Sequence, residues 1–295
     1  MGLAMKTRQL SKSYRGRPAL RQLDLDVPVQ SVFGYLGPNG AGKTTTIRLL
    51  AGLIRPSAGR AEVLGLDAVA DREKVQRRIG YLPGDFVAYP DLTAGQYLRY
   101  LANLRGGVDW AFIEHLANRF DLDLEPRLGT LSHGNKQKIG VVQAFMHSPE
   151  LLILDEPTAG LDPIMQREFL ALVRETRSQG GTVFLSSHIL SEVEAVADTV
   201  GILRAGRLVV TQSVEALRAQ AVRRLDLTFS SAVPVEQLRR VGGVREVSVA
   251  GLTAHLAVEG STADLLKVAA PHDVTNIVTH EADLEAIFLD YYSDR

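Results

Sequence analysis

The chain of 295 residues carries 33 Lys and Arg against 34 Asp and Glu, a formal net charge of −1, and no cysteine. This balance gives no general basic surface for nucleic acid, and the lack of thiols excludes disulfides, a thiolate zinc site and a cysteine nucleophile. No apolar run approaches the ~18 residues needed to cross a bilayer, and the N-terminus lacks the apolar stretch of a signal peptide. We therefore expect a soluble cytoplasmic chain of one large or two moderate domains, whose membrane role would need a separate partner.

The first third of the sequence alternates strand and helix patterns. Residues 23–27 alternate with period two and predict a half-exposed strand. Residues 32–36 predict a strand, residues 45–50 a helix, and residues 79–82 another short strand.

Helical patterns occupy residues 91–120, where two apolar stripes predict two helices. The first stripe consists of Leu92, Gln96, Tyr97, Tyr100, Leu101 and Leu104, and the second of Trp110, Ile113, Leu116, Ala117 and Phe120. A parallel sheet is expected to resume with residues 151–154 and 182–186, which are apolar on both faces, as in strands covered by helices. A helix at about 165–178 separates them, and residues 200–210 predict a terminal hairpin.

The sequence after about residue 220 predicts a second, small domain. Its expected elements are strand 225–229, helix 235–241, strands 245–249 and 254–258, helix 262–270 and strand 274–279. This βαββαβ order is the ferredoxin-like arrangement. A final helix is expected at residues 283–292.

Residues 37–44 fit the phosphate-loop pattern G-x-x-x-x-G-K-[ST] between a strand-like and a helix-like segment. Glycines let the backbone wrap so that N–H groups point at phosphate oxygens, and the helix adds the positive end of its dipole. Lys43 would reach the β and γ phosphates of ATP and Thr44 would hold Mg²⁺; an ordinary Gly-rich turn is the weaker alternative. The candidate nucleotide-binding residues in this segment are Gly37, Pro38, Asn39, Gly40, Ala41, Gly42, Lys43, Thr44 and Thr45.

Two acids end the apolar strand at residues 151–154. A phosphate-loop enzyme needs a carboxylate at a neighbouring strand end to hold Mg²⁺, and Asp155 has that position. A second carboxylate beside it can orient or deprotonate the attacking water, which suits Glu156 as a catalytic residue. For an isolated pair, a surface strand end would be the better interpretation.

By these motifs the chain resembles the ATP-binding subunit of an ABC transporter over residues 5–215 or so. The resemblance implies that Tyr14 stacks on adenine and that His188, in Leu-Ser-Ser-His, is the switch histidine at the γ-phosphate and a second catalytic residue. It also implies that Gly-Leu-Asp-Pro at residues 160–163, with Asp162, crosses a dimer interface.

Residues 131–137 read Leu-Ser-His-Gly-Asn-Lys-Gln and occupy the position of the family signature, usually written LSGGQ. Ser132 and Gly134 at a helix N-terminus would form an outward anion site that meets ATP held by another copy, so a homodimer would enclose two ATP molecules. His133 and Asn135 depart from the common signature. Such variants occur in family members that export drugs, lipids or polysaccharides.

Gly84 is the sharper departure, because the family normally has there a glutamine that touches Mg²⁺ and water. Hydrolysis rate and coupling are therefore in question, and our hypothesis is that Asp85 assumes part of the role. The resemblance also implies that residues 86–100 flank a groove for a cytoplasmic helix of the permease. Exposed Phe86, Val87 and Tyr89 would suit such a contact, although packing inside their own subdomain is an equal alternative.

We thus expect an α/β P-loop NTPase core of the ABC ATPase type at 1–215, with a helical subdomain at about 86–147, and a small α+β ferredoxin-like accessory domain at 222–295. The extension resembles that of ABC-2 and drug-export subunits, which favours export over nutrient uptake. The family resemblance as a whole implies a peripheral ATPase on the cytoplasmic face of the membrane, bound to an integral permease. Two alternatives remain open: a soluble ABC ATPase acting on ribosomes or DNA, and a regulatory module switched by ATP binding.

Overall fold

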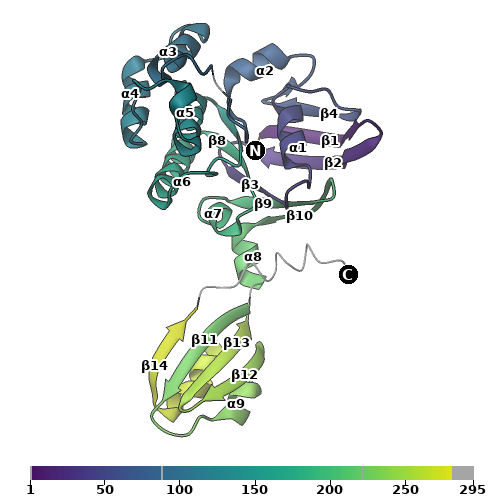
Figure 1. The fold of residues 1–295 in the computed structure, drawn as a ribbon. Coiled ribbons are helices and arrows are strands. Elements are labelled where there is room, and N and C mark those ends of the chain that lie inside the picture. Colours follow the sequence, from purple (N-terminus) through teal and green to yellow (C-terminus); the bar gives the residue numbers. More distant parts are fainter. Residues whose placement is uncertain (1, 88, 221, 281–295) are drawn as a thin grey trace. The chain divides into compact units, whose positions relative to one another are not determined.

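The computed structural model describes residues 2–87, 89–220 and 222–280. The chain divides into two compact units, Met1–Thr211 and Gln212–Arg295, which are described separately (Figure 1).

The central sheet of the first unit has, within the described residues, six strands in the order β10-β9-β3-β8-β7-β6. Strand β8 pairs in parallel with β3 on one side and with β7 on the other, so the three carboxyl ends meet at one edge. Every residue of β3, β7 and β8 is buried, as expected for strands covered on both faces. The strands are β3 (Val32–Leu36), β6 (Ile79–Leu82), β7 (Leu151–Asp155), β8 (Thr182–Ser187), β9 (Thr199–Arg204) and β10 (Arg207–Ser213).

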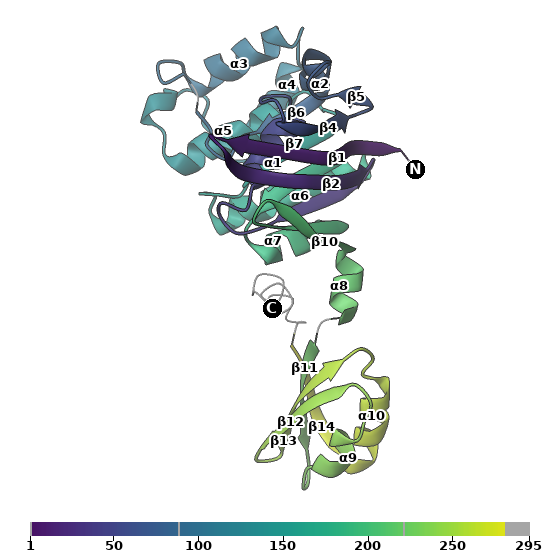
Figure 2. The same ribbon diagram turned by 90° about the vertical axis from the view of Figure 1, so that its right-hand side faces the viewer.

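A second, antiparallel sheet has the order β2-β1-β4-β5 within the described part of the unit, and β1 and β2 form a long paired ribbon (Figure 2). Its strands are β1 (Leu3–Tyr14), β2 (Arg17–Pro28), β4 (Ala58–Val63) and β5 (Leu66–Asp67). The predicted alternation is confirmed, because Leu23, Leu25 and Val27 are buried whereas Asp24 and Asp26 are exposed. The buried side chains join Phe33, Tyr35 and Phe184 of the central sheet in one core.

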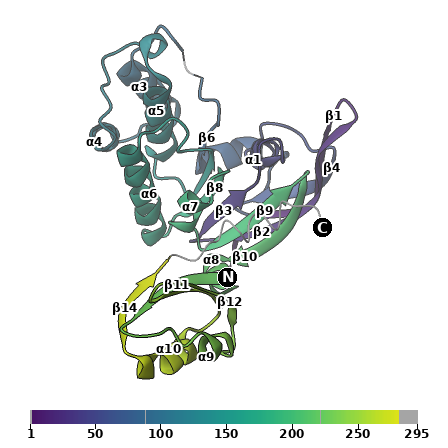
Figure 3. The same cartoon turned by 60° about the horizontal axis from the view of Figure 1, so that its bottom comes forward.

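The helices position the site residues around the central sheet. They are α1 (Lys43–Leu50), α2 (Arg72–Arg78), α3 (Ala94–Leu104), α4 (Trp110–Arg119), α5 (His133–Phe145), α6 (Pro163–Ser178) and α7 (Leu190–Glu194). Helices α3, α4 and α5 gather on the side of the unit away from β1 and β4 (Figure 3).

The stripe predicted for the second of the two helices is confirmed at Ile113, Leu116, Ala117 and Phe120, which are buried, whereas Trp110 is half-buried. The stripe predicted for α3 is only partly confirmed, since Tyr97 is buried but Gln96 is exposed and Leu92 and Leu101 are half-buried. Helix α3 is rotated from the predicted register. Its buried residues are Ala94, Tyr97, Leu98 and Ala102, whereas Tyr100 and Leu104 are 47% and 66% exposed.

Two local features set the rotation of α3. Thr93 and Gln96 form a capping box, in which the Gln96 side chain turns back to the helix start instead of into the core. The backbone of Gly95 donates to Leu124 O at 2.8 Å, and this close approach favours small side chains on the buried face. The apolar pattern gave too little weight to alanine, which supplies two of the four buried residues of α3.

The second unit is a ferredoxin-like α+β fold, as predicted. Within the described residues its sheet has the order β12-β13-β11-β14 with antiparallel pairs throughout. Helices α9 and α10 cover one face of the sheet, where Phe229, Leu238 and Leu265 are buried (Figure 2). The elements are α8 (Val214–Gln220), β11 (Val222–Phe229), α9 (Val235–Arg239), β12 (Val244–Ala250), β13 (Thr253–Glu259), α10 (Ala263–Ala269) and β14 (Val274–Thr279). The helix predicted at 283–292 lies outside the described residues.

The observed rotation of α3 makes a direct prediction for a matched pair of leucines. Leu98 is fully buried, so Leu98→Ala should lower the free energy of unfolding by about 2–4 kcal/mol through lost burial and a cavity. Leu104→Ala on the exposed face should change it by less than about 0.5 kcal/mol. Chemical denaturation of the two variants measures both values, and a larger loss for Leu104→Ala would contradict the observed register.

Candidate active site

The phosphate-loop segment connects β3 to α1 and has the backbone that its glycines permit. Gly40 and Gly42 have φ of 80° and 111°, and a Cβ on Gly42 would lie 2.7 Å from Ala19 O. Lys43 is 6% exposed and donates to Gly37 O at 2.5 Å and to Pro38 O at 3.4 Å. The lysine side chain therefore folds back across its own loop, and its ammonium group lies against the carbonyls of Gly37 and Pro38.

The hydroxyl side chains of the first helical turn differ in their surroundings. Thr44 is exposed and Thr45 is half-buried. Thr46 is buried and donates to Gly42 O at 3.1 Å, next to the Tyr35 hydroxyl at 3.2 Å. Thr46 thus links Gly42 of the phosphate loop to Tyr35 of β3. The motif pattern alone did not predict this role.

Asp155 ends β7 with a carboxylate that is 1% exposed. Ser186 Oγ donates to its Oδ1 at 2.6 Å, while its Oδ2 has no hydrogen-bond partner among the described residues. A buried carboxylate oxygen without a partner is costly, and it suits a hard cation such as Mg²⁺, which takes oxygen ligands. A Cβ on Gly84 would lie 3.3 Å from this same oxygen.

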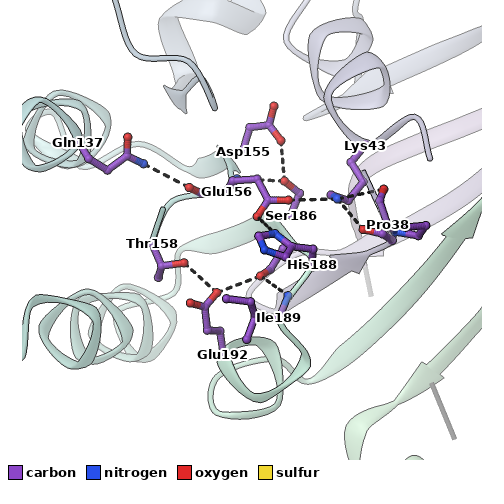
Figure 4. Close-up of polar contacts among 12 residues, drawn as sticks. Pro38, Lys43, Gln137, Asp155, Glu156, Thr158, Ser186, His188, Ile189 and Glu192 are labelled. Carbon is purple, nitrogen blue, oxygen red and sulfur yellow. Dashed lines mark hydrogen bonds and ion pairs between the residues drawn. The ribbon is translucent and has the colours of Figure 1, made fainter. Parts of the chain in front are cut away.

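Glu156 has the left-handed φ of 48°, which is rare outside glycine, and its side chain joins two other candidate residues (Figure 4). Its Oε1 lies 3.1 Å from Lys43 Nζ in an ion pair that lacks the geometry of a hydrogen bond. Its Oε2 lies 2.8 Å from His188 Nδ1. An ionised carboxylate only accepts, so Nδ1 carries the hydrogen. The structure thus brings together Lys43, Glu156 and His188 beside Asp155.

The signature residues contact the loop after β7. Ser132 caps α5 by accepting from Asn135 N at 3.3 Å. A Cβ on Gly134 would lie 2.5 Å from Gly160 O, so the start of α5 and this loop are in close contact. A Cβ on Gly160 would in turn meet the ring of His133.

Asp162 caps α6 by accepting from Ile164 N at 2.9 Å and Met165 N at 3.0 Å. The Met165 N–H, followed by the Ile164 N–H, lowers the pKa of the Asp162 carboxyl. Within the described chain, the side-chain hydrogen bonds of Ser132 and Asp162 cap the starts of α5 and α6. The structure does not bring these two residues to the phosphate loop of the same chain.

Gln137 of α5 was missed by sequence reasoning. It is fully buried and donates from Nε2 to Glu156 O at 3.3 Å and to Pro157 O at 3.0 Å. Its sequence signal is its place at the end of the signature segment, between Lys136 and Lys138, which does not reveal that it is buried.

Tyr14 lies at the end of β1, where it pairs with Arg17 across the turn, and is 45% exposed. Lys12 Nζ lies 5.2 Å from the centre of its ring. The paired strand β2 adjoins the phosphate loop through Ala19, whose carbonyl limits Gly42. The exposed ring therefore belongs to a hairpin beside the loop.

The comparisons with known proteins agree with this geometry. The family model described as ABC transporter matches residues 20–159. The bacitracin transport ATP-binding protein BcrA of Bacillus licheniformis is 35% identical over 298 residues, which cover 98% of this chain and 97% of that protein. The chain belongs to the ABC transporter family of ATP-binding subunits. The resemblance inferred from the motifs is therefore confirmed, and the chain is an ATP-binding, ATP-hydrolysing subunit of this family.

Two further relatives of this ABC subunit define the extent of the likeness. The linearmycin resistance ATP-binding protein LnrL of Bacillus subtilis (strain 168) is 28% identical over 97% of both chains. A solved ATP-binding subunit of an ABC transporter is 32% identical with a TM-score of 0.67, and the match covers 74% of this chain and 92% of that one. In the described parts of this subunit, no helix is long and apolar enough to cross a membrane.

The position of Gly84 makes a prediction about the cation. Gly84→Gln would direct an amide at Asp155 Oδ2, and its carbonyl oxygen is a suitable Mg²⁺ ligand. The Mg²⁺ concentration that gives half-maximal ATPase activity should fall by about threefold or more. Gly84→Ala, which adds Cβ alone, is the control and should match the wild type. Equal values for the two variants would contradict a cation at Asp155.

Proposed function

We propose that this chain binds ATP with Mg²⁺ and works as one of two identical subunits that drive a separate membrane permease in the export of an antibiotic-like compound. The observation that carries the proposal is the Glu156 carboxylate, held between Lys43 and His188 beside the unpartnered oxygen of Asp155. The likeness to bacitracin transport and linearmycin resistance proteins over almost the whole chain supports export. The names of these two relatives refer to transport and resistance and not to ribosomes or DNA.

The nucleotide would alter the pairing that the structure shows. Lys43 is held by Gly37 O and Glu156, and phosphate oxygens would replace both of these contacts. Glu156 would then be free to accept a proton from the attacking water, while its bond to His188 keeps the ring in place at the γ-phosphate. Thr44 and Asp155 would hold Mg²⁺, which balances phosphate charge when it is bound. With Glu156 and His188 in these roles, turnover is a better account of the site than a switch driven by binding alone.

The signature residues would act in the second copy. Ser132 and Gly134 lie at the N-terminus of α5, and this end of a helix favours anions. Their contacts within the chain are with α5 and the loop after β7, so they would bind the ATP held by the phosphate loop of another subunit. Two copies arranged in this way would enclose two ATP molecules, with Tyr14 of each stacked on adenine. Asp162 would lie at the interface between the copies.

A cluster of exposed apolar and aromatic side chains from the segment between β6 and α3 and from α3 itself would bind the permease. Val87, Tyr89 and Tyr100 are 84%, 60% and 47% exposed, and the rings of Tyr89 and Tyr100 lie edge to face at 6.4 Å. Phe86, by contrast, packs against Tyr97 at 6.0 Å and is half-buried. Such a patch suits an amphipathic helix, and this contact would place the subunit on the cytoplasmic face of the membrane.

The role of Glu156 is tested by Glu156→Gln. The amide keeps the side-chain shape but cannot take a proton, so kcat should fall by at least about 100-fold. ATP should then hold the variant as a dimer, measured by light scattering after size exclusion. Adding Lys43→Ala to this variant should abolish the dimer, because the phosphate contact is lost. Rapid turnover by Glu156→Gln would contradict the proposed catalytic role.

The permease contact is tested by isolating the tagged chain from detergent-solubilised membranes of its own host. The wild type should recover an integral membrane protein in about equal amount. Tyr89→Ala combined with Tyr100→Ala should lose it while ATPase activity in solution is retained. Leu252→Ala, an exposed apolar residue of the second unit, is the control. Recovery of only soluble partners by the wild type would refute the transporter role.

A further inference from the structure

The backbone at Glu156 needs external support. A left-handed conformation costs a non-glycine residue about 1 kcal/mol or more, and it persists where the surroundings fix it. The parallel ladder cannot supply that support, because the pairing of β7 with β8 ends at Asp155 and Ser186. Glu156 and His188 therefore lie beyond the last paired residues of their strands.

Glu192 of α7 joins the two segments at that point (Figure 4). Its Oε2 accepts from Thr158 Oγ1 at 2.8 Å and from Ser187 Oγ at 2.9 Å. Thr158 follows Glu156 by two residues and Ser187 directly precedes His188, and both are at least 96% buried. Ser187 Oγ also accepts from Ile189 N at 2.9 Å, which fixes the turn around His188.

We propose that Glu192 is a positioning residue that keeps the Glu156 carboxylate and the His188 ring in contact; this rests on the proposed catalytic role of Glu156. A charged acceptor shared by two buried hydroxyl groups makes stronger hydrogen bonds than a neutral one, so it can bind the two unpaired segments to each other. On the other side of the loop, Gln137 holds the carbonyls of Glu156 and Pro157. The loop is thereby held from α5 and from α7, and Glu192 also bonds to Ser187, the residue directly before His188.

The test measures steady-state ATPase activity of Glu192→Ala and Glu192→Gln, with Ser191→Ala, an exposed residue of the same helix, as the control. Glu192→Ala should lower kcat by about tenfold or more and leave KM for ATP within about twofold, because no phosphate contact changes. Glu192→Gln should stay within about threefold of the wild type, since an amide oxygen can accept from both hydroxyls. Ser191→Ala should match the wild type.

A double variant separates positioning from general support of the fold. In the Glu156→Gln background, Glu192→Ala should not lower the slow residual rate further, because its effect passes through the Glu156 carboxylate. An equal fractional loss in both backgrounds, or a KM that rises with kcat unchanged, would overturn the proposal. Full activity of Glu156→Gln itself would instead refute the function on which it rests.

Variants at Thr158 keep the test valid if Glu192→Ala does not fold. Thr158→Val removes the hydroxyl at nearly constant volume and should reproduce the loss of kcat, whereas Thr158→Ser retains the donor and should not. Full activity of folded Thr158→Val would overturn the proposal. Loss in Thr158→Ser equal to that in Thr158→Val would do so as well.

Discussion

The site depends on the place of β8 between β3 and β7 in the central sheet. Parallel strands send their carboxyl ends to the same edge, so this order puts the phosphate loop, the Ser187–His188 turn and the Asp155–Glu156 pair next to one another. Ser186 in the middle strand then bonds both to the Asp155 carboxylate and to the backbone N–H of Glu156.

The local chemistry of this edge could be predicted from the sequence because each part is a short contiguous segment. The phosphate loop, the two acids after β7 and the buried strands are defined by neighbouring residues, and the ferredoxin-like order of the second unit follows from strand and helix periods. The rotation of α3 could not be predicted in this way, because it depends on the capping box at Thr93 and on a close backbone contact to Leu124. The size of the apolar side chains is a poor guide to the buried face of α3, because two of its four buried residues are alanines.

The residues that sequence reasoning missed share one property: their partners are far away in the chain. Gln137 bonds to carbonyls about 20 positions later, and Thr158 and Glu192 are 34 positions apart. A buried amide or carboxylate on an amphipathic helix has the same pattern as one at the surface until the tertiary contact is known. Gly84 is the opposite case, because a missing side chain is evident from the motif while its significance comes from the adjacent Asp155 oxygen.

The close packing of Gly134 against Gly160 has a consequence for how two copies would communicate. Because neither glycine has a side chain, the start of α5 and the loop after β7 approach each other closely, and Gln137 adds two hydrogen bonds between them. In the proposed dimer, the end of α5 that carries Ser132 touches the nucleotide of the partner. The ATP bound by one copy would then help to position the catalytic carboxylate of the other copy. The two sites would therefore hydrolyse ATP cooperatively and not independently.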